Sequence, residues 1–355
     1  MRQIAKIKSK QLALAVLMLL TMARTSLAPP DKNTVEYYLR ADTTTKTMPD
    51  GQVIVMWGFA LDSAFGAEDG EVTVPGPVLT VPNDKKNLVI NLDNNLGVPV
   101  SIVIPSQINT TMVPVKFTDD KGRQRIRAFT HETEPNNTEP VIYEWKNFRP
   151  GTYLYHSGSH PAVQVQMGLY GCLKKDVEKV KGKDVPNVAY KQGNNLVTYD
   201  TDIVLCFSEI DPALHQAVAD SNYGPGKAMT STINYEPKYF LINGEPYSSG
   251  SLPLPAGNPN DRVLIRFVNA GLETHVPVLQ DFYMNVVAED GYKYQYAKEQ
   301  YSLILPALKT KDVVIIPQSV GTYPVYDRRL RLTNADISPG GMLTYLNVVS
   351  NGGGI

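Results

Sequence analysis

Short apolar segments bounded by turn residues recur along the chain, and they constrain its fold more than any other feature. They are rich in Val, Ile, Tyr and Phe, and Gly, Pro, Asn or Asp flank them, which is typical of β-strands. One short helix is expected near Pro212, because Asp211 is a favourable N-cap and Pro is favoured at the first helical position. With no long helical pattern, the sequence predicts an all-β protein built of antiparallel sandwiches or small barrels.

The expected strands divide into two series. The first series is Val53–Phe59, Leu88–Leu92, Val98–Ile104, Val141–Trp145, Gly151–His156 and Met167–Leu173. The second series is Ile203–Glu209, Arg262–Ala270, His275–Leu279, Met284–Glu289, Asp312–Ile316, Gly321–Tyr326 and Met342–Val348. A Gly-Thr-Tyr motif begins a late strand in each series, at Gly151 and at Gly321, and a Gly-rich turn then leads into a final strand. A polar, lysine-rich stretch separates the series. We therefore expect two tandem Greek-key β-domains, residues 34–178 and 195–350, joined by a linker at 179–194.

The N-terminus has the pattern of an export signal. Four basic residues precede an apolar stretch, Leu12–Ala23, that is short for a membrane span. Ser26 and Ala28 fit the −3 and −1 positions of a signal peptide covering residues 1–28. Pro29 would hinder that cleavage, so cleavage after Ala23 is an alternative, and an uncleaved anchor is another. We expect a periplasmic or secreted protein with no membrane span in the mature chain.

The charge balance and the cysteine content limit the kinds of partner and cross-link that the chain could have. The chain has 34 basic and 35 acidic residues, so nothing indicates nucleic-acid binding. A homo-oligomer is compatible with the sequence, and no protein or small-molecule partner is identified by it. Cys172 and Cys206 are the only cysteines. In an oxidising compartment they could form a disulfide, and two small buried thiols are the alternative.

Several motifs resemble the multicopper oxidase superfamily over roughly residues 45–350. The motifs are Pro75-Gly76-Pro77, Asn94-Asn95-Leu96, Gly151-Thr152-Tyr153-Leu154-Tyr155-His156-Ser157, Gly168-Leu169-Tyr170-Gly171, Leu241-Ile242-Asn243-Gly244, Arg266-Phe267-Val268-Asn269-Ala270 and Ala288-Glu289-Asp290-Gly291. The arrangement is similar to the two-domain type, which includes laccase-like and copper nitrite reductase-like proteins. The resemblance implies that both domains are cupredoxin-like β-sandwiches or barrels, and it implies copper as a cofactor and oxidoreductase activity.

The metal-ligand motifs of that family are largely absent. Val103 and Pro105 stand where a His-x-His pair is expected, and Ser157 stands beside His156 where a blue copper site would need Cys. The segment leading to Gly341-Met342 contains neither Cys nor His. A blue copper centre takes two His and a thiolate. The five histidines of the chain cannot supply both that centre and a three-copper cluster, so we interpret both ligand sets as lost.

Three sets of residues could still bind a metal or a proton. His156 and His160 could share one copper or zinc ion completed by water or a neighbouring chain, or could be simple hydrogen-bonded side chains. His275 and Met342 occupy the positions of a blue-copper His and its axial ligand, and we interpret them as a relic. His215 could form a carboxylate–imidazole cluster with Glu209 and Asp211, or could be a surface residue of a capped helix.

The sequence thus predicts an exported multicopper oxidase-like protein with degenerate copper sites. It would be a binding or structural module that holds at most one copper or other metal ion. A copper-dependent oxidoreductase with an unconventional site is the alternative, and its catalytic residues are not identified by the sequence.

Overall fold

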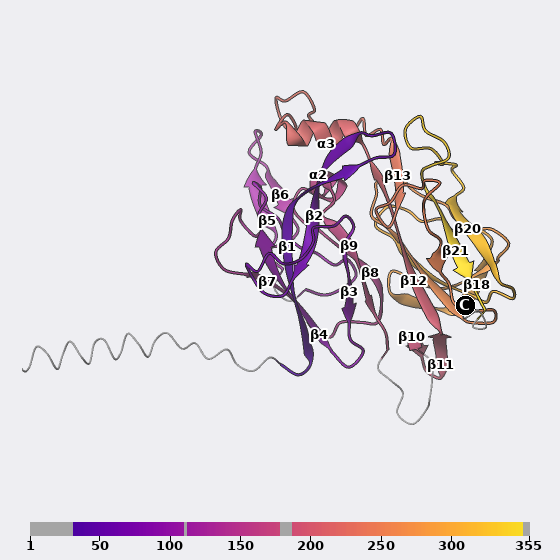
Figure 1. The fold of residues 1–355 in the computed structure, drawn as a ribbon. Coiled ribbons are helices and arrows are strands. Elements are labelled where there is room, and N and C mark those ends of the chain that lie inside the picture. The colour runs from indigo at the N-terminus through magenta and orange to yellow at the C-terminus, as the bar shows by residue number, and fades with distance from the viewer. Residues whose placement is uncertain (1–30, 110–111, 178–186, 351–355) are drawn as a thin grey trace, which may run out of the picture. The chain divides into compact units, whose positions relative to one another are not determined.

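The structure is a computed structural model that describes residues 31–109, 112–177 and 187–350 (Figure 1). Strands dominate the described residues, and the helices among them are the short α2 (Pro161–Met167) and α3 (Pro212–Ala219). The all-β prediction is confirmed. No described helix is long and apolar enough to cross a membrane. The predicted signal peptide, residues 1–28, lies outside the described residues.

The first half of the chain forms two sheets around one core, together with a largely exposed hairpin. One sheet contains β1 (Thr34–Thr47), β2 (Val53–Asp62), β4 (Asn87–Asn94) and β7 (Val141–Trp145), in the order β2-β1-β4-β7. Another contains β3 (Gly76–Val81), β8 (Gly151–His156) and β9 (Tyr170–Lys175), in the order β3-β9-β8. The hairpin consists of β5 (Val115–Thr118) and β6 (Gln124–Ala128). Alternate β4 residues Leu88, Ile90 and Leu92 point into the core, where Tyr143 and Trp145 of the neighbouring β7 are fully buried. This alternation follows from the two-residue period of a strand.

The second half forms two larger sheets and a hairpin. The first sheet contains β12 (Thr201–Ile210), β13 (Tyr239–Ile242), β15 (Val263–Asn269), β17 (Met284–Glu289), β18 (Tyr292–Gln300) and β19 (Thr310–Ile315), in the order β13-β12-β15-β19-β17-β18. The second contains β14 (Leu254–Pro255), β16 (Pro277–Leu279), β20 (Gly321–Asp327) and β21 (Leu343–Val348), in the order β14-β21-β20-β16. The hairpin consists of β10 (Asn187–Gln192) and β11 (Asn195–Tyr199). Each sheet takes its strands from one half of the chain.

Strand β15 is buried at every position, which shows how the second half is covered. Ile265 and Phe267 face the core between the two larger sheets. On the opposite face, Leu264 packs against the β10–β11 hairpin, and Val268 packs against Leu154 and other residues of the first half. The strand therefore has the continuous apolar pattern expected of a strand covered on both faces.

The sequence predictions differ from the structure in several places, and strands β1 and β18 are among the elements that were not predicted. Residues Val98–Ile104 form no continuous strand, and only isolated bridges occur, at Val100 with Thr133 and at Val103 with His156. Helix α2 was not predicted, although Pro161 starts it in the favoured first position. Part of the predicted linker, residues 187–192, is strand β10, which packs on the second-half sheet. The domain boundaries themselves stay predictions.

Candidate functional site

His275 lies between two buried carboxylates. Its Nδ1 is 3.0 Å from Asp327 Oδ2 and its Nε2 is 3.3 Å from Glu209 Oε2. All three side chains are inaccessible to solvent. Glu209 comes from the end of β12, Asp327 from the end of β20, and His275 from the segment just before β16. We call this set the Glu209–His275–Asp327 triad.

The remaining carboxylate oxygens of the triad are also satisfied. Glu209 Oε1 accepts hydrogen bonds from the backbone N–H groups of Leu272 (2.8 Å) and Glu273 (2.6 Å). Asp327 Oδ1 accepts from the N–H groups of Val276 (2.9 Å) and Arg329 (3.1 Å). Buried charges are tolerated only when they are paired and hydrogen-bonded in this way. The triad therefore joins the segment 272–276 to the ends of two strands.

The electrostatics favour a charged His275. Burial alone would lower the pKa of His275, but hydrogen bonds to Asp327 and Glu209 and their negative charges outweigh burial and raise the pKa to about 9. Burial also opposes the charge on Asp327, but the bond with His275 and the backbone donors lower the pKa of that carboxyl. At neutral pH, His275 is thus an imidazolium that donates from both ring nitrogens, and it has no lone pair to offer to a metal ion.

Met342 is placed by its backbone rather than by a metal. Its side chain is fully buried in the second-half core. Its N–H donates to the carbonyl of Arg331, and its own carbonyl accepts from the N–H of Asp327. Met342 therefore holds the chain beside the triad, and its thioether lies among apolar side chains. The interpretation of His275 and Met342 as a relic of a blue copper site stays a prediction.

His215 does not join the cluster that the sequence suggested. Glu209 pairs with His275 instead, and Asp211 caps α3 by accepting from the N–H groups of Ala213 and Leu214. The capped-helix alternative is confirmed, but a surface position for His215 is wrong. The side chain is buried, and its Nδ1 lies 2.8 Å from the carbonyl oxygen of Val55. Burial lowers the pKa of His215, although nearby backbone carbonyls oppose this shift.

His156, like His215, has a ring nitrogen with no hydrogen-bond partner among the described residues, and it stands at a ligand position of the motif that the sequence suggested. It ends β8 and is buried, and its Nδ1 lies 2.8 Å from the carbonyl oxygen of Ser157. A carbonyl can only accept, so Nδ1 carries the proton. Burial lowers the pKa of His156 to about 4, with a smaller opposing effect from that carbonyl. Nε2 therefore has a free lone pair, and it has no hydrogen-bond partner among the described residues. Metal-bound imidazoles commonly donate their other N–H in this manner.

His160 lies in a different environment from His156. It is exposed and precedes α2 with φ 41°, and its backbone N–H donates to the carbonyl of Arg127. Within the described parts of the chain, no hydrogen bond connects the two imidazoles, and no group of three or more His, Cys, Asp or Glu side chains could hold a metal ion. The prediction that His156 and His160 share an ion therefore stays a prediction.

The polar groups beside His156 are bound to one another. Ser157 Oγ donates to Gln164 Oε1 at 2.6 Å, and Gln164 Nε2 donates to the carbonyl of Pro99 at 2.9 Å. Gln166 Oε1 accepts from the hydroxyl of Tyr235 at 2.9 Å. Ser157 stands where a blue copper site would have a thiolate, and its hydroxyl orders the turn before α2. These residues do not fit a blue copper centre, which needs a thiolate.

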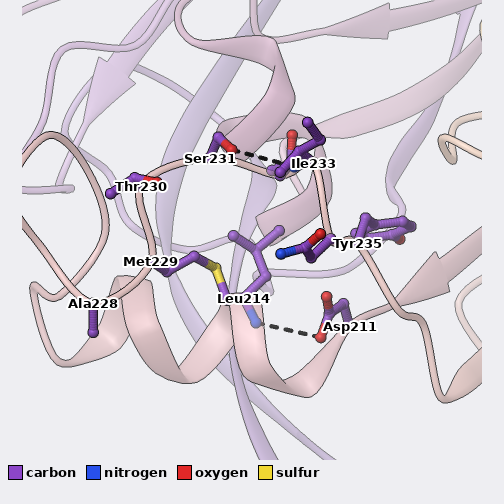
Figure 2. Close-up of a pocket in the computed structure, with 10 residues that line it drawn as sticks. Asp211, Leu214, Ala228, Met229, Thr230, Ser231, Ile233 and Tyr235 are labelled. Atoms are coloured by element: carbon purple, nitrogen blue, oxygen red, sulfur yellow. Dashed lines mark hydrogen bonds between the residues drawn. The ribbon is translucent and has the colours of Figure 1, made fainter.

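A pocket of about 180 Å³ lies between α3 and the segment 228–235 (Figure 2). Its lining contains Leu214, Met229 and Tyr235, with Asp211 at the helix start. Both carboxylate oxygens of Asp211 are engaged, one by the α3 N-terminus and the other by the N–H of Glu236 at 3.0 Å. The pocket thus presents a helix cap rather than a free acid or base.

Replacing Asp211 by alanine should lower the free energy of unfolding by about 1–2 kcal/mol, because it removes an N-cap from two backbone donors. Chemical denaturation measures this loss. Asp220→Ala at the other end of α3, where the cap bonds are made by backbone, is the matched control and should change stability by less than about 0.5 kcal/mol. Equal effects of the two substitutions would contradict the capping role.

Comparison with known proteins agrees with the fold. Residues 202–347 match the family model described as Multicopper oxidase. The multicopper oxidase mgLAC aligns at TM-score 0.67 with 19% identity, covering 91% of this chain and 88% of that one. The blue copper oxidase from Nitrosomonas europaea aligns at 0.64 with 18% identity, covering 89% and 86%. Copper nitrite reductase from Nitrosomonas europaea aligns at 0.61 with 20% identity, covering 90% and 95%.

Curated protein sequences give no match. At the identities above, the structural likeness concerns the fold alone. The chain has the cupredoxin-like fold of multicopper oxidases, laccases and copper nitrite reductase. The resemblance to the multicopper oxidase superfamily is thereby confirmed, with the match to the family model confined to residues 202–347.

Proposed function

We propose that this chain is an exported, two-domain multicopper oxidase-like protein whose copper sites have degenerated. It acts as a binding or structural module, and it holds at most one copper or other metal ion, at His156. Fold alone does not establish oxidase activity, since function depends on the groups at the site. The described residues around His156 and His275 supply no copper-binding thiolate and no cluster of imidazoles.

The observation that carries this proposal is the Glu209–His275–Asp327 triad. A blue-copper position needs a neutral imidazole with a free ring nitrogen. Both nitrogens of His275 face carboxylates at 3.0 and 3.3 Å, and the pKa of about 9 keeps the ring protonated at neutral pH. An ion pair at the position that the resemblance assigns to a copper ligand supports the proposal that this copper site has degenerated.

His156 is the candidate ligand in the first domain for which the hydrogen bonds of the ring argue most directly. Its neutral ring presents Nε2 with no protein partner among the described residues. A bound ion would supply Lewis-acid or redox chemistry, and the coordination that His156 leaves open would fall to His160, water or a neighbouring chain. The free nitrogen is also the observation that favours the second candidate, a copper-dependent oxidoreductase with an unconventional site.

Copper titration of variants tests the assignment of the site. We expect the wild type to bind no more than one equivalent, and His156→Gln to abolish this binding because it removes the free Nε2. The matched control is His215→Gln, since His215 is also buried and also has Nδ1 on a backbone carbonyl. Isothermal calorimetry measures stoichiometry and affinity, and circular dichroism confirms that each variant is folded.

The variant His160→Ala tests whether His160 shares the ion with His156 or whether water or a neighbouring chain completes the coordination. A shared ion predicts that this exposed residue matters, so its removal should weaken binding about 10-fold or more. Unchanged affinity would exclude His160 as a ligand. Retention of full copper binding by the folded His156→Gln/His160→Ala variant would contradict the site altogether. Copper-dependent oxidation of a phenol or reduction of nitrite by the wild type would favour the enzyme alternative.

A further inference from the structure

The two cysteines come from different halves of the chain and share one buried cluster. Cys172 is in β9, the last described strand of the first half, and Cys206 is in β12, the long strand that opens the second half. The two strands are in contact, and both cysteines belong to the same buried apolar cluster, where each is a free thiol. Because these are the only cysteines in the chain, each can pair within the molecule only with the other.

Their surroundings are apolar. Cys172 and Cys206 are 2% and 1% exposed, and they belong to one buried cluster with Leu154, Tyr170 and Val268. Contact with Cys172 and burial raise the pKa of the Cys206 thiol well above its usual value. A thiolate, the form that binds metals and acts as a nucleophile, is therefore disfavoured in the folded protein. A disulfide carries no charge and is compatible with this environment.

We propose that Cys172 and Cys206 form a disulfide that links the two halves when the chain folds in an oxidising compartment. The oxidant is a small-molecule or protein disulfide. One cysteine thiolate attacks it, forms a mixed disulfide and releases one thiolate. The second cysteine then attacks the first cysteine's sulfur and releases the other thiolate. The two cysteine thiols are oxidised, and the oxidant disulfide is reduced to two thiols.

The burial of both sulfurs fixes when the bond can form. Exchange requires a thiolate and an in-line approach by the oxidant. In the folded protein neither is favoured, because the cluster that surrounds the cysteines excludes solvent. The bond should therefore form while the halves are still apart, or during unfolding fluctuations. Once the reduced protein has folded, its thiols should be protected from oxidation.

Refolding in glutathione buffers tests the proposal. The full chain is unfolded, then refolded with reduced glutathione alone or with a reduced/oxidised mixture. After the mixture, we expect a monomer two hydrogens lighter by intact mass, with no thiol titratable in denaturant, and a peptide map that joins the segments of Cys172 and Cys206. Protein folded reduced should keep both thiols when oxidised glutathione is added later, and lose them when denaturant is also present.

Stability gives an independent readout. The cross-linked protein should melt roughly 5–10 °C above its reduced form. The variant Cys172→Ala/Cys206→Ala should show no difference between the two buffers, and it serves as the control for effects of glutathione itself. Two titratable thiols after oxidative refolding of a folded wild type, or only intermolecular disulfides, would overturn the proposal. The experiment is done without copper, so it is independent of the proposed function.

Discussion

Replacing His275 by glutamine is expected to lower the free energy of unfolding by about 3–5 kcal/mol near pH 6. The substitution leaves Glu209 and Asp327 buried and without a counter-ion, although their backbone donors remain. Urea denaturation followed by circular dichroism measures the loss. His215→Gln is the control, because His215 is equally buried but has a carbonyl partner instead of carboxylates. A similar effect of both substitutions would show that only packing is lost.

The pH dependence of this loss identifies the charge on His275. The folded pKa of about 9 exceeds the unfolded value of about 6.5, so the contribution of His275 is complete below about 6.5 and is lost as the pH rises through about 9. The difference between wild type and His275→Gln should shrink over that range. The triple variant Glu209→Gln/His275→Gln/Asp327→Asn, which removes all three charges, should recover part of the stability. A difference that is constant with pH would contradict the ion-pair account.

Replacing Arg266 by methionine should be comparably destabilising, about 3–5 kcal/mol. Arg266 is fully buried and binds Asp202 Oδ2 at 3.0 Å, Asp176 Oδ1 at 2.8 Å and Thr152 Oγ1 at 3.1 Å. Burial opposes its charge, but the carboxylates of Asp312, Asp176 and Asp202 raise the pKa of Arg266 overall. Without the guanidinium, these carboxylates would repel one another in a poorly hydrated space.

This substitution should weaken the attachment between the halves, because Thr152 and Asp176 come from the first half and Arg266 from the second. Equilibrium unfolding would show the loss, and limited proteolysis would show faster cleavage. Arg123→Met is the control, since Arg123 is about half exposed and its pair with Asp119 should be worth less than about 1 kcal/mol. If Arg266→Met were as mild as this control, the buried network would not hold the halves together.

The sequence was a good guide to strands and a poor guide to buried charge. Alternating or continuous apolar runs and the paired Gly-Thr-Tyr motifs identified β8, β20 and most core strands, because strand periodicity is local. The partners of His275 are 66 and 52 residues away in the chain. Glu209 was therefore assigned to the nearer His215. Pairing between distant segments is set by sheet topology, and no local pattern predicts it.

Hairpin β10–β11 and helix α2 were not predicted because the local sequence signal of each is weak. Hairpin β10–β11 is short and polar on one face, and only Ala189, Tyr190, Val197 and Tyr199 face the second-half sheet. Helix α2 has only 7 residues, so its apolar periodicity is too short to be recognised in the sequence. The loss of the imidazole and thiolate motifs, in contrast, is read from the sequence alone and stays a prediction.

Visible absorption and electron spin resonance of the copper-loaded protein test the central claim most directly. The account predicts no intense band near 600 nm (roughly the thiolate-to-copper charge-transfer region), because Ser157 replaces a thiolate and Cys172 and Cys206 are buried as a pair. Any bound Cu(II) should amount to no more than one equivalent, should give the spectrum of a site with nitrogen and oxygen ligands, and should vanish in His156→Gln. A strong blue band, or several coppers per chain in the wild type, would contradict the claim that the copper sites have degenerated.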